Sequence, residues 1–493
     1  MADSSIAARL KETHPLYQQL SPDWEFYVDS YQGGDTYTRK SAYLFRHARE
    51  TEHDYGDRLN RATFTNLVRK QVDIYSSFIF KEPIERQTDD ALFREFENDA
   101  DRKGTPLSQI MAEQVGKVGM IQGHTVTIVD LPSDATKSKT RRQDRTLGIR
   151  PYLRVYSPLE VVDWAIDANG SYLWVRVCET AADTSAPFAS RVTPTKIYRT
   201  WTRTEFIVHN EDGQELDRGD HGLGEVPAVF TPAKEHLQYL EVGESVVVDT
   251  SILNRAIYNY QSLLDEFLYR QAFNILALPI DGETTPEKIK SLTQALGTQK
   301  GLFFPAGTSP PSYITPPSNP AEIIMQRIED AHRELIEMAK LQDRKSTSSE
   351  KSGIAHAYEF HESNSAFAKI AKNLEDGERK IIRLFYKWMN KDEVPVSITY
   401  PTDFNVTTLA DTIDESLGLF SLNVSPTFNR LVKKRVVDET FPGLDEATDT
   451  KIDEEIDTTP DDNQLEQALT KSFSQASEAV AGRDTQATIS PAA

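Results

Sequence analysis

The sequence predicts an α+β fold in which helices and β-strands occupy separate stretches of the chain. Three observations lead to this prediction. Two amphipathic helical patterns, over 250–273 and 321–342, flank an insert with strand-like segments. Residues 151–232 are rich in strand-forming residues with turn signals between them. By contrast, the first hundred residues are charged and mainly helical in pattern.

The composition indicates a globular chain with several compact units. At 493 residues, 38% of them hydrophobic, the chain is too long for one core. Its formal net charge of −21 argues against a protein that wraps nucleic acid, because phosphate neutralisation requires clustered Lys and Arg. An acidic channel wall would repel phosphates and let a DNA duplex pass without being retained, although solubility is the simpler explanation of the negative charge.

Cysteine usage and the N-terminus bear on the compartment. Cys178 is the sole cysteine, so no intramolecular disulfide can form and we expect a reduced, intracellular setting. The N-terminus lacks a basic start followed by an apolar core, and no run approaches the roughly twenty apolar residues of a membrane span. We therefore expect a soluble protein without an export signal.

Helical patterns precede the β-rich region. Apolar residues at helical spacing from Leu59 to Ile79 predict one helix that ends before Pro83. A second helix from Thr105 leads into a strand over 125–129. Residues 132–150 form a basic surface loop, which we interpret as a solvated insertion in preference to a contact with DNA or a neighbouring subunit.

Residues 151–232 predict an antiparallel meander. Strands over 161–166 and 172–177 flank the turn 167–170, and a further hairpin follows around 197–208. The glycine cluster 219–224 lacks the spacing of a dinucleotide-binding motif, so we interpret it as tight turns.

The two amphipathic helices each carry an apolar stripe and a polar face. The stripes are Leu253, Tyr260, Leu263 and Phe267 on the first helix and Ile324, Ile328, Leu335 and Met338 on the second. The polar faces are Arg255, Asp265 and Glu266 on the first and Glu329, Asp330, Glu334 and Glu337 on the second. Strands over 275–280 and 301–305 and a short helix over 286–296 make the insert a small α/β unit on a two-helix stalk.

The remaining elements are mainly helical. A polar loop over 344–353 leads into a long helix over 359–390 and a strand over 396–400. Three short helices follow, over 408–420, 426–439 and 445–456, with Ser425 as N-cap of the second. From residue 441 onward twelve acidic residues oppose three basic ones, so this end supplies a net −9 of the total −21.

No enzyme signature is present. The phosphate-binding pattern Gly-x4-Gly-Lys-Ser/Thr does not occur. His356 and His361 are five residues apart, which does not place both imidazoles on one helical face, so we expect no metal site. The acidic run 453–455 has no apolar setting that would tune a carboxylate for acid–base chemistry. We expect no catalytic activity and no cofactor.

The order helix, α/β insert, helix, polar loop, long helix resembles the portal proteins of tailed bacteriophages. Segments 66–84, 352–355, 425–428 and 441–444 support the resemblance, which covers nearly the whole chain. It implies this division: wing 1–245, first stem helix 246–273, clip 274–320, second stem helix 321–342, tunnel loop 343–357, long helix and returning wing strand 358–404, helical crown 405–460 and acidic tail 461–493.

The resemblance also implies a function. A portal is a homo-oligomeric ring, a dodecamer, at one capsid vertex of the virion. It is assembled in the host cytoplasm, and double-stranded DNA enters and leaves through it without sequence specificity. Its partners are the terminase large subunit, the head–tail adaptor and the major capsid and scaffold proteins, with no membrane partner.

Tunnel-loop residues would then face the DNA channel: Arg344, Lys345, Ser348, Lys351, Ser352 and Gly353. Without the resemblance, a flexible connector is the simpler interpretation of this loop. Two other functions stay open: another oligomeric virion structural protein, such as a head–tail adaptor or baseplate component, and an unrecognised hydrolase or nuclease, for which no motif speaks.

Overall fold

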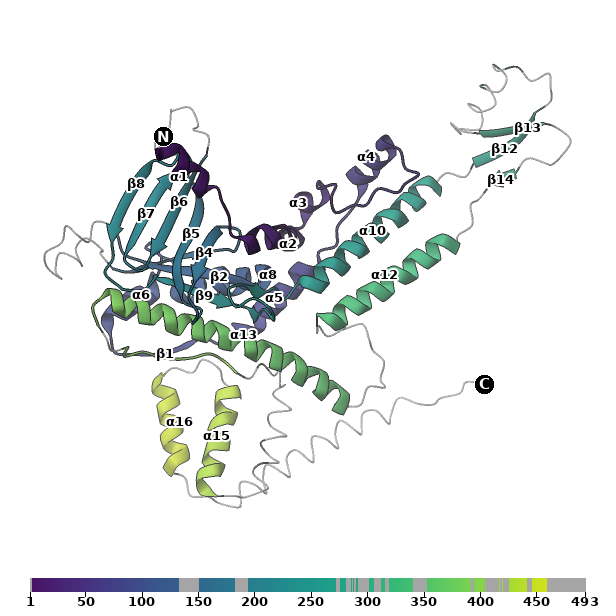
Figure 1. Ribbon diagram of the computed structural model, residues 1–493. Coiled ribbons are helices and arrows are strands. Elements are labelled where there is room, and N and C mark those ends of the chain that lie inside the picture. The colour runs from purple at the N-terminus through teal and green to yellow at the C-terminus, as the bar shows by residue number, and fades with distance from the viewer. Residues whose placement is uncertain are drawn as a thin grey trace, which may run out of the picture. The chain divides into compact units, whose positions relative to one another are not determined.

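The computed structural model confirms the α+β class (Figure 1). It describes residues 2–132, 150–181, 194–271, 275–280, 301–305, 312–314, 319–339, 353–391, 394–402, 404, 425–440 and 446–458, with single positions at 285, 287, 290, 416 and 419. Contacts divide the chain into two compact units, Met1–Phe404 and Asn405–Ala493.

Helices form the N-terminal part of the first unit. They are α1 (Ala2–Leu10), α2 (Pro15–Gln32), α3 (Gly34–Thr38), α4 (Glu52–Arg61) and α5 (Leu67–Ile79). The predicted single helix from Leu59 to Ile79 is therefore wrong, because the chain breaks between α4 and α5. Asn66 causes the new start: its side chain accepts the N–H of Arg69 at 2.7 Å as an N-cap.

The predicted helix from Thr105 is present, but its middle is a π-helix and not an α-helix. After β1 (Glu85–Gln87) and α6 (Ala91–Asn98), the chain forms α7 (Leu107–Gln109), a π-helix (Ile110–Lys117) and α8 (Val118–Gln122). Ile110, Met111 and Val115 are fully or almost fully buried, so the π-helix contributes to the main core.

Two of the sheets in the first unit, one of three and one of five strands, hold most of the predicted β-rich region. The strands β3 (Tyr152–Tyr156), β2 (His124–Asp130) and β9 (Ala228–Pro232) form one in that order. The predicted meander is confirmed as the other, a five-stranded antiparallel sheet of β4 (Val161–Ile166), β5 (Tyr172–Ala181), β6 (Thr195–Thr202), β7 (Glu205–Asn210) and β8 (Glu215–Asp220). Cys178 is half-buried on β5. Gly222 and Gly224 have positive φ after β8, as predicted for turns.

The long helix α13 (Gly353–Trp388) starts six residues earlier than predicted and crosses β9. At Gly377 a Cβ atom would lie 2.5 Å from Thr231 Oγ1, so the absence of a side chain permits this close crossing. The predicted return strand is β15 (Ser397–Thr399), which pairs antiparallel with β1. The sequence did not reveal β1, because three residues are too short to show a period of two.

The two-helix stalk and its insert are also present. Along the chain, helix α10 (Val248–Gln271) precedes and helix α12 (Asn319–Met338) follows three strands. These are β12 (Ile275–Ile280), β13 (Gly301–Pro305) and β14 (Ser312–Ile314). Strand β12 pairs parallel with β13 and antiparallel with β14. The sequence did not reveal β14, and the short helix predicted over 286–296 lies outside the described residues apart from positions 287 and 290.

In the second unit, α15 (Pro426–Thr440) and α16 (Glu446–Thr458) match two of the three predicted helices. Ser425 Oγ accepts the N–H of Phe428 at 3.2 Å, which confirms the predicted N-cap. Lys434 joins the helices, with its Nζ 3.2 Å from Asp453. The predicted helix over 408–420, the tail 461–493 and the basic loop within 132–150 lie almost wholly outside the described residues.

Candidate functional site

The stalk of α10 and α12 is the candidate site, because the residues of the predicted apolar stripes and polar faces lie on these two helices. Its buried contact is a cluster of Leu67 with Ile257, Ala331, Leu335 and Ala339, and Leu253 and Ile328 pack against it. The two helices run antiparallel in Figure 1, and the Arg327 guanidinium lies 5.9 Å from the ring centre of Tyr260.

The apolar stripes lie only in part at this contact. Leu335 is 1% exposed, and Leu253, Tyr260, Phe267, Ile324 and Ile328 are half-buried. Leu263 and Met338, by contrast, are 40% and 41% exposed. The buried face of α10 is rotated from the predicted stripe, because Ile257 and Tyr258 occupy it.

The side of α10 that faces the body is polar, which the sequence pattern did not indicate. Five of its small polar side chains are buried: Thr250, Ser251, Asn254, Asn259 and Ser262. Asn254 Oδ1 accepts the N–H of Leu67 at 3.1 Å, and its Nδ2 donates to Thr65 O at 3.0 Å. This side chain therefore completes the start of α5 and attaches the stalk to the body.

A second attachment comes from Arg58 on α4, which also holds the segment before that helix. Arg58, 2% exposed, donates to both carboxylate oxygens of Glu50 at 2.7 and 2.8 Å and to Ser262 Oγ at 3.1 Å. Hydrogen bonding to Glu50 raises the pKa of Arg58. The guanidinium thus stays charged and holds this segment against α10.

The predicted polar faces divide into bonded and exposed residues. Arg255 lies over the ring of Phe26 at 4.6 Å, and Glu266 pairs with Arg61 at 2.5 Å, so both act within the chain. Partial desolvation raises the pKa of Asp265.

On α12, three of the predicted acids are exposed and one is half-buried: Glu329, Glu334, Glu337 and Asp330. Arg333 lies 3.6 Å from Asp330, and Arg327 lies 3.8 Å from Glu334. The exposed ion pairs contribute little to stability, so this face presents mainly negative charge.

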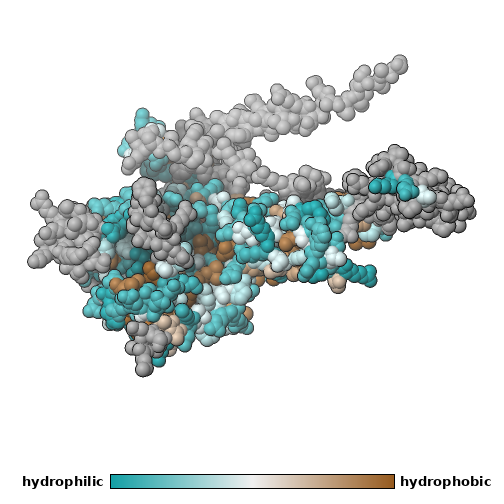
Figure 2. All heavy atoms as spheres, turned by 90° about the horizontal axis from the view of Figure 1, so that it is seen from above, coloured by the Kyte–Doolittle hydropathy of each residue, from teal (hydrophilic) through white to brown (hydrophobic). Residues whose placement is uncertain are grey.

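Large apolar side chains remain exposed on both stalk helices. Besides Leu263 and Met338 they are Ile252, Leu268, Tyr269, Ile323 and Met325, each 50–63% exposed. Figure 2 shows a face of the molecule on which apolar side chains interrupt a mainly hydrophilic surface. Several such side chains on two neighbouring helices are typical of a surface that another molecule covers.

Most of the predicted tunnel loop, 343–357, lies outside the described residues, which resume at residue 353. Arg344, Lys345, Ser348, Lys351 and Ser352 lie outside them, and Gly353 is the first residue of α13. The described part of the preceding segment ends at Ala339. The tunnel loop and its contact with DNA therefore stay a prediction.

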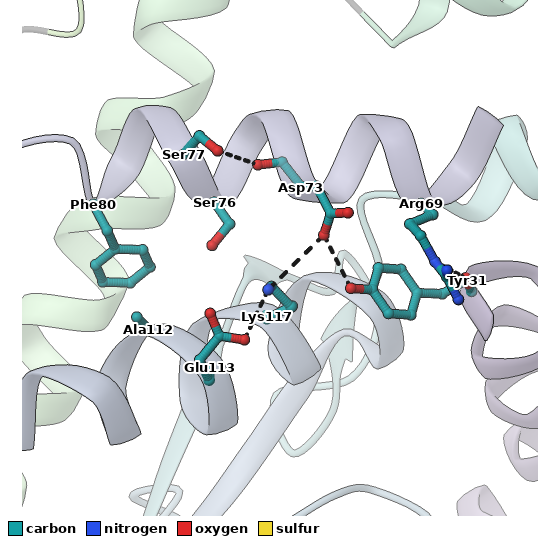
Figure 3. A pocket seen from close by; sticks show the side chains of 9 residues that line it. All are labelled: Tyr31, Arg69, Asp73, Ser76, Ser77, Phe80, Ala112, Glu113 and Lys117. Carbon is teal, nitrogen blue, oxygen red and sulfur yellow. Dashed lines mark hydrogen bonds and ion pairs between the residues drawn. The ribbon is translucent and has the colours of Figure 1, made fainter. Parts of the chain in front are cut away.

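A pocket of about 620 Å³ lies between α5 and the π-helix (Figure 3). Asp73 accepts the Tyr31 hydroxyl at 3.0 Å, and Lys117 lies 2.7 Å from Glu113 and 3.9 Å from Asp73. The fourth charged group, Arg69, donates to the backbone carbonyls of Tyr31 and Gln32. Desolvation, together with the hydrogen bond to Asp73, raises the pKa of Tyr31 to about 12. Because the charges compensate one another inside the pocket, the lining selects no class of ligand.

Within the described ranges, no three His, Cys, Asp or Glu side chains are arranged to hold a metal ion. His356 and His361 lie on α13, but their side chains are not among those that the structure describes. Among the helices that the structure describes, none combines the length and the apolar character of a membrane span.

Comparisons with known proteins give little. No protein-family model matches the chain, and no curated protein matches it. Among solved structures, a chain of the "Neck of native GTA particle computed with C12 symmetry" aligns with 74% of this chain and 89% of its own length, at 12% identity and a TM-score of 0.43. A likeness this distant identifies neither a family nor a function.

Proposed function

We propose that this chain is the subunit of a portal ring of the tailed-bacteriophage type, through which double-stranded DNA is packaged and later ejected. The order of elements supports the proposal: stalk helix, three-stranded clip, stalk helix, a polar loop and the long helix α13 follow each other as the resemblance requires. The ring, a dodecamer, would occupy one capsid vertex of the virion.

The observation that carries the proposal is the pair α10 and α12 with apolar side chains on its exposed surface. One contact between the helices buries the cluster around Leu335, yet Ile252, Ile323 and Met325 remain at least half exposed. In a closed ring each copy presents two different faces to its two neighbours, so both helices of the stalk can be covered. Burying these side chains would supply part of the assembly free energy.

The charges of the stalk and loop suit passage of DNA. Exposed Glu329, Glu334 and Glu337 would repel phosphates, whereas Arg344, Lys345 and Lys351 would contact them from the loop. Repeated weak contacts that salt screens allow the duplex to move. The chain would act by geometry and charge, without catalysis or a cofactor of its own.

Clip and wing would bind the other components. The clip, 274–320, would bind the terminase large subunit during packaging and the head–tail adaptor afterwards. The wing would contact major capsid and scaffold proteins, and assembly would take place in the host cytoplasm.

Electron microscopy and native mass spectrometry of the purified chain test the ring. We expect closed rings of about a dozen copies with an open axial channel. Ile323→Ser with Met325→Ser should lower the fraction of chains in rings, whereas Leu216→Ser, an exposed leucine on the edge strand β8, should not. Wild-type chains that remain monomeric or form closed dimers would overturn the proposal.

A loop variant tests the DNA contact. Replacing Arg344, Lys345 and Lys351 with Ala should leave ring assembly intact and alter DNA packaging or retention. Monomers from this variant would contradict the assignment of the loop. Rings that fail to bind a terminase would favour an adaptor or baseplate component.

A further inference from the structure

We propose that the turn over 236–241 of one copy docks on the loop over 45–49 of the next copy. This inference rests on the proposed ring, and it names two surfaces that would meet between neighbouring subunits. Each surface combines exposed apolar side chains with charges of one predominant sign. The two signs are opposite.

The first surface, the leucine turn, projects between β10 (Lys234–Glu235) and β11 (Gly243–Glu244). Leu237 is 96% exposed and Leu240 is 82% exposed, the two highest values among the large apolar side chains that the structure describes. Glu235 and Glu241 lie immediately before and after the turn, and Lys369 of α13 lies 3.7 Å from Glu235 in an exposed pair that water screens. Apolar side chains so exposed gain nothing from folding, so their placement suggests a partner.

The leucine turn is held in one conformation. His236 Nδ1 accepts the N–H groups of Gln238 at 3.1 Å and Tyr239 at 3.2 Å, and the two rings of His236 and Tyr239 stack at 4.9 Å. At the base, Gly243 lies so close to Gly123 that a Cβ atom would be 2.1 Å from its carbonyl oxygen. Docking would thus cost little conformational entropy.

The second surface, the basic loop, lies on α10 and carries Phe45, 59% exposed, with Arg46, His47 and Arg49. Its backbone is fixed at Phe45: the N–H donates to Asn259 Oδ1 and the carbonyl accepts from Arg58, both at 2.8 Å.

Positive charge and apolar area extend from this loop along α10. The Arg255 guanidinium lies 5.5 Å from the Phe45 ring centre, and Ile252 and Leu263 are exposed on the same helix. At helical spacing these two residues share a face with Arg255 and Asn259, so the apolar strip continues past the loop.

The leucine turn and the basic loop are complementary in apolar area and in charge, which favours a second copy of the chain as the binding partner. The leucines would cover Phe45 and the strip along α10, and Glu235 and Glu241 would face Arg46 and Arg49. A symmetric contact of two leucine turns would place acid against acid. Nucleic acid would engage the basic loop alone and leave both leucines in water.

Cysteine cross-linking between two pools of protein tests the pairing. Both pools carry Cys178→Ser; one adds Gln238→Cys and the other Ala48→Cys, at exposed positions that leave the leucines, Phe45 and all charges intact. We expect oxidation of the mixed pools to yield a covalent dimer and each pool alone to yield none. A chain with both cysteines should give a ladder of covalent oligomers.

A charge exchange gives an independent readout. Glu235→Lys with Glu241→Lys should raise the midpoint concentration of ring assembly about tenfold, or 1.4 kcal/mol. Combining them with Arg46→Glu and Arg49→Glu should restore it. Leu237→Ser with Leu240→Ser should weaken assembly similarly, and Leu216→Ser should have no effect.

The outcomes separate the two proposals. Wild-type rings without a mixed-pool cross-link and without rescue would overturn this pairing and leave the portal ring standing. Dimers from the Gln238→Cys pool alone would show a symmetric contact and overturn it also. Wild-type chains that never assemble would overturn both.

Discussion

Replacing Arg86 with Leu should strongly destabilise the first unit, because it isolates a buried carboxylate. Arg86 on β1 donates to the two carboxylate oxygens of Glu378 on α13 at 2.5 and 3.1 Å. The side chains of Arg86 and Glu378 are 2% and 0% exposed. Tyr400 donates to the same carboxylate at 2.5 Å. This network connects β1, α13 and the end of β15.

The size of the effect follows from the burial. Removing one partner of a buried ion pair leaves an uncompensated charge and costs about 3–5 kcal/mol. Replacing both Arg86 and Glu378 with Leu removes the charges together, so the double variant should be more stable than Arg86→Leu alone. Its remaining deficit comes from the Tyr400 hydroxyl, which loses its acceptor, and from Ser108 and Glu97, which lose the donor Arg86.

Urea unfolding followed by circular dichroism measures the difference. The midpoint of Arg86→Leu should fall clearly below wild type, with partial recovery in the double variant. Arg39→Leu is a matched control, since Arg39 and Asp35 form an exposed pair with side chains 80% and 78% exposed; it should change stability by less than about 1 kcal/mol. An Arg86→Leu variant that unfolds like wild type would refute the reasoning.

Three further predictions concern the attachment of the helices. Gly377→Ala should cost about 1–3 kcal/mol, because its Cβ would collide with Thr231 across β9. Asn254→Ala should accelerate hydrogen exchange at the Leu67 amide, which keeps the Thr65 carbonyl but loses its other acceptor, and lower stability by about 1–3 kcal/mol. Two cationic side chains of α13 lower the pKa of Glu225 to about 2. Stability from this group is complete above pH 4.5 and is lost as the pH falls towards 2, so Glu225→Gln should flatten the decline of Tm in acid.

Controls separate these effects from general damage. Gly56→Ala on α4 meets no atom within 4 Å, so it should be neutral or stabilising by up to about 1 kcal/mol. Gln261→Ala removes an exposed contact to Thr65 at 3.4 Å and should leave exchange at the start of α5 unchanged. Equal losses in a variant and its control would contradict the assigned contacts.

Local patterns were sufficient where one period continues over many residues. The stalk helices, the long helix α13 and the meander from β4 to β8 were all predicted, because each repeats an apolar period for several turns or strands. Ser425 was predicted as a cap because its hydrogen bond joins residues three apart. The long helix start, in contrast, differed by six residues, since helix ends depend on contacts beyond the helix.

Short elements and the orientation of helices required the tertiary structure. Strands β1 and β14 have three residues each and become strands only through distant partners, β15 and β12. The apolar stripe on α10 does not coincide with the face that is buried within one chain: Leu263 is exposed, and the buried Asn254 is polar. Burial of a polar side chain depends on a partner far along the chain, here Leu67, which no local period can indicate.

The sequence by itself therefore determined the α+β class, the order of helix, insert, helix and long helix, and the concentration of acid near the end, since these depend on composition and short-range periodicity. Only the tertiary structure decided which side chains attach the stalk to the body and which stay exposed. The leucine turn and the basic loop are 187 or more residues apart, and the chain does not mark them as related. Their exposure depends on packing, because a side chain is covered or left exposed by neighbours that come from distant parts of the chain.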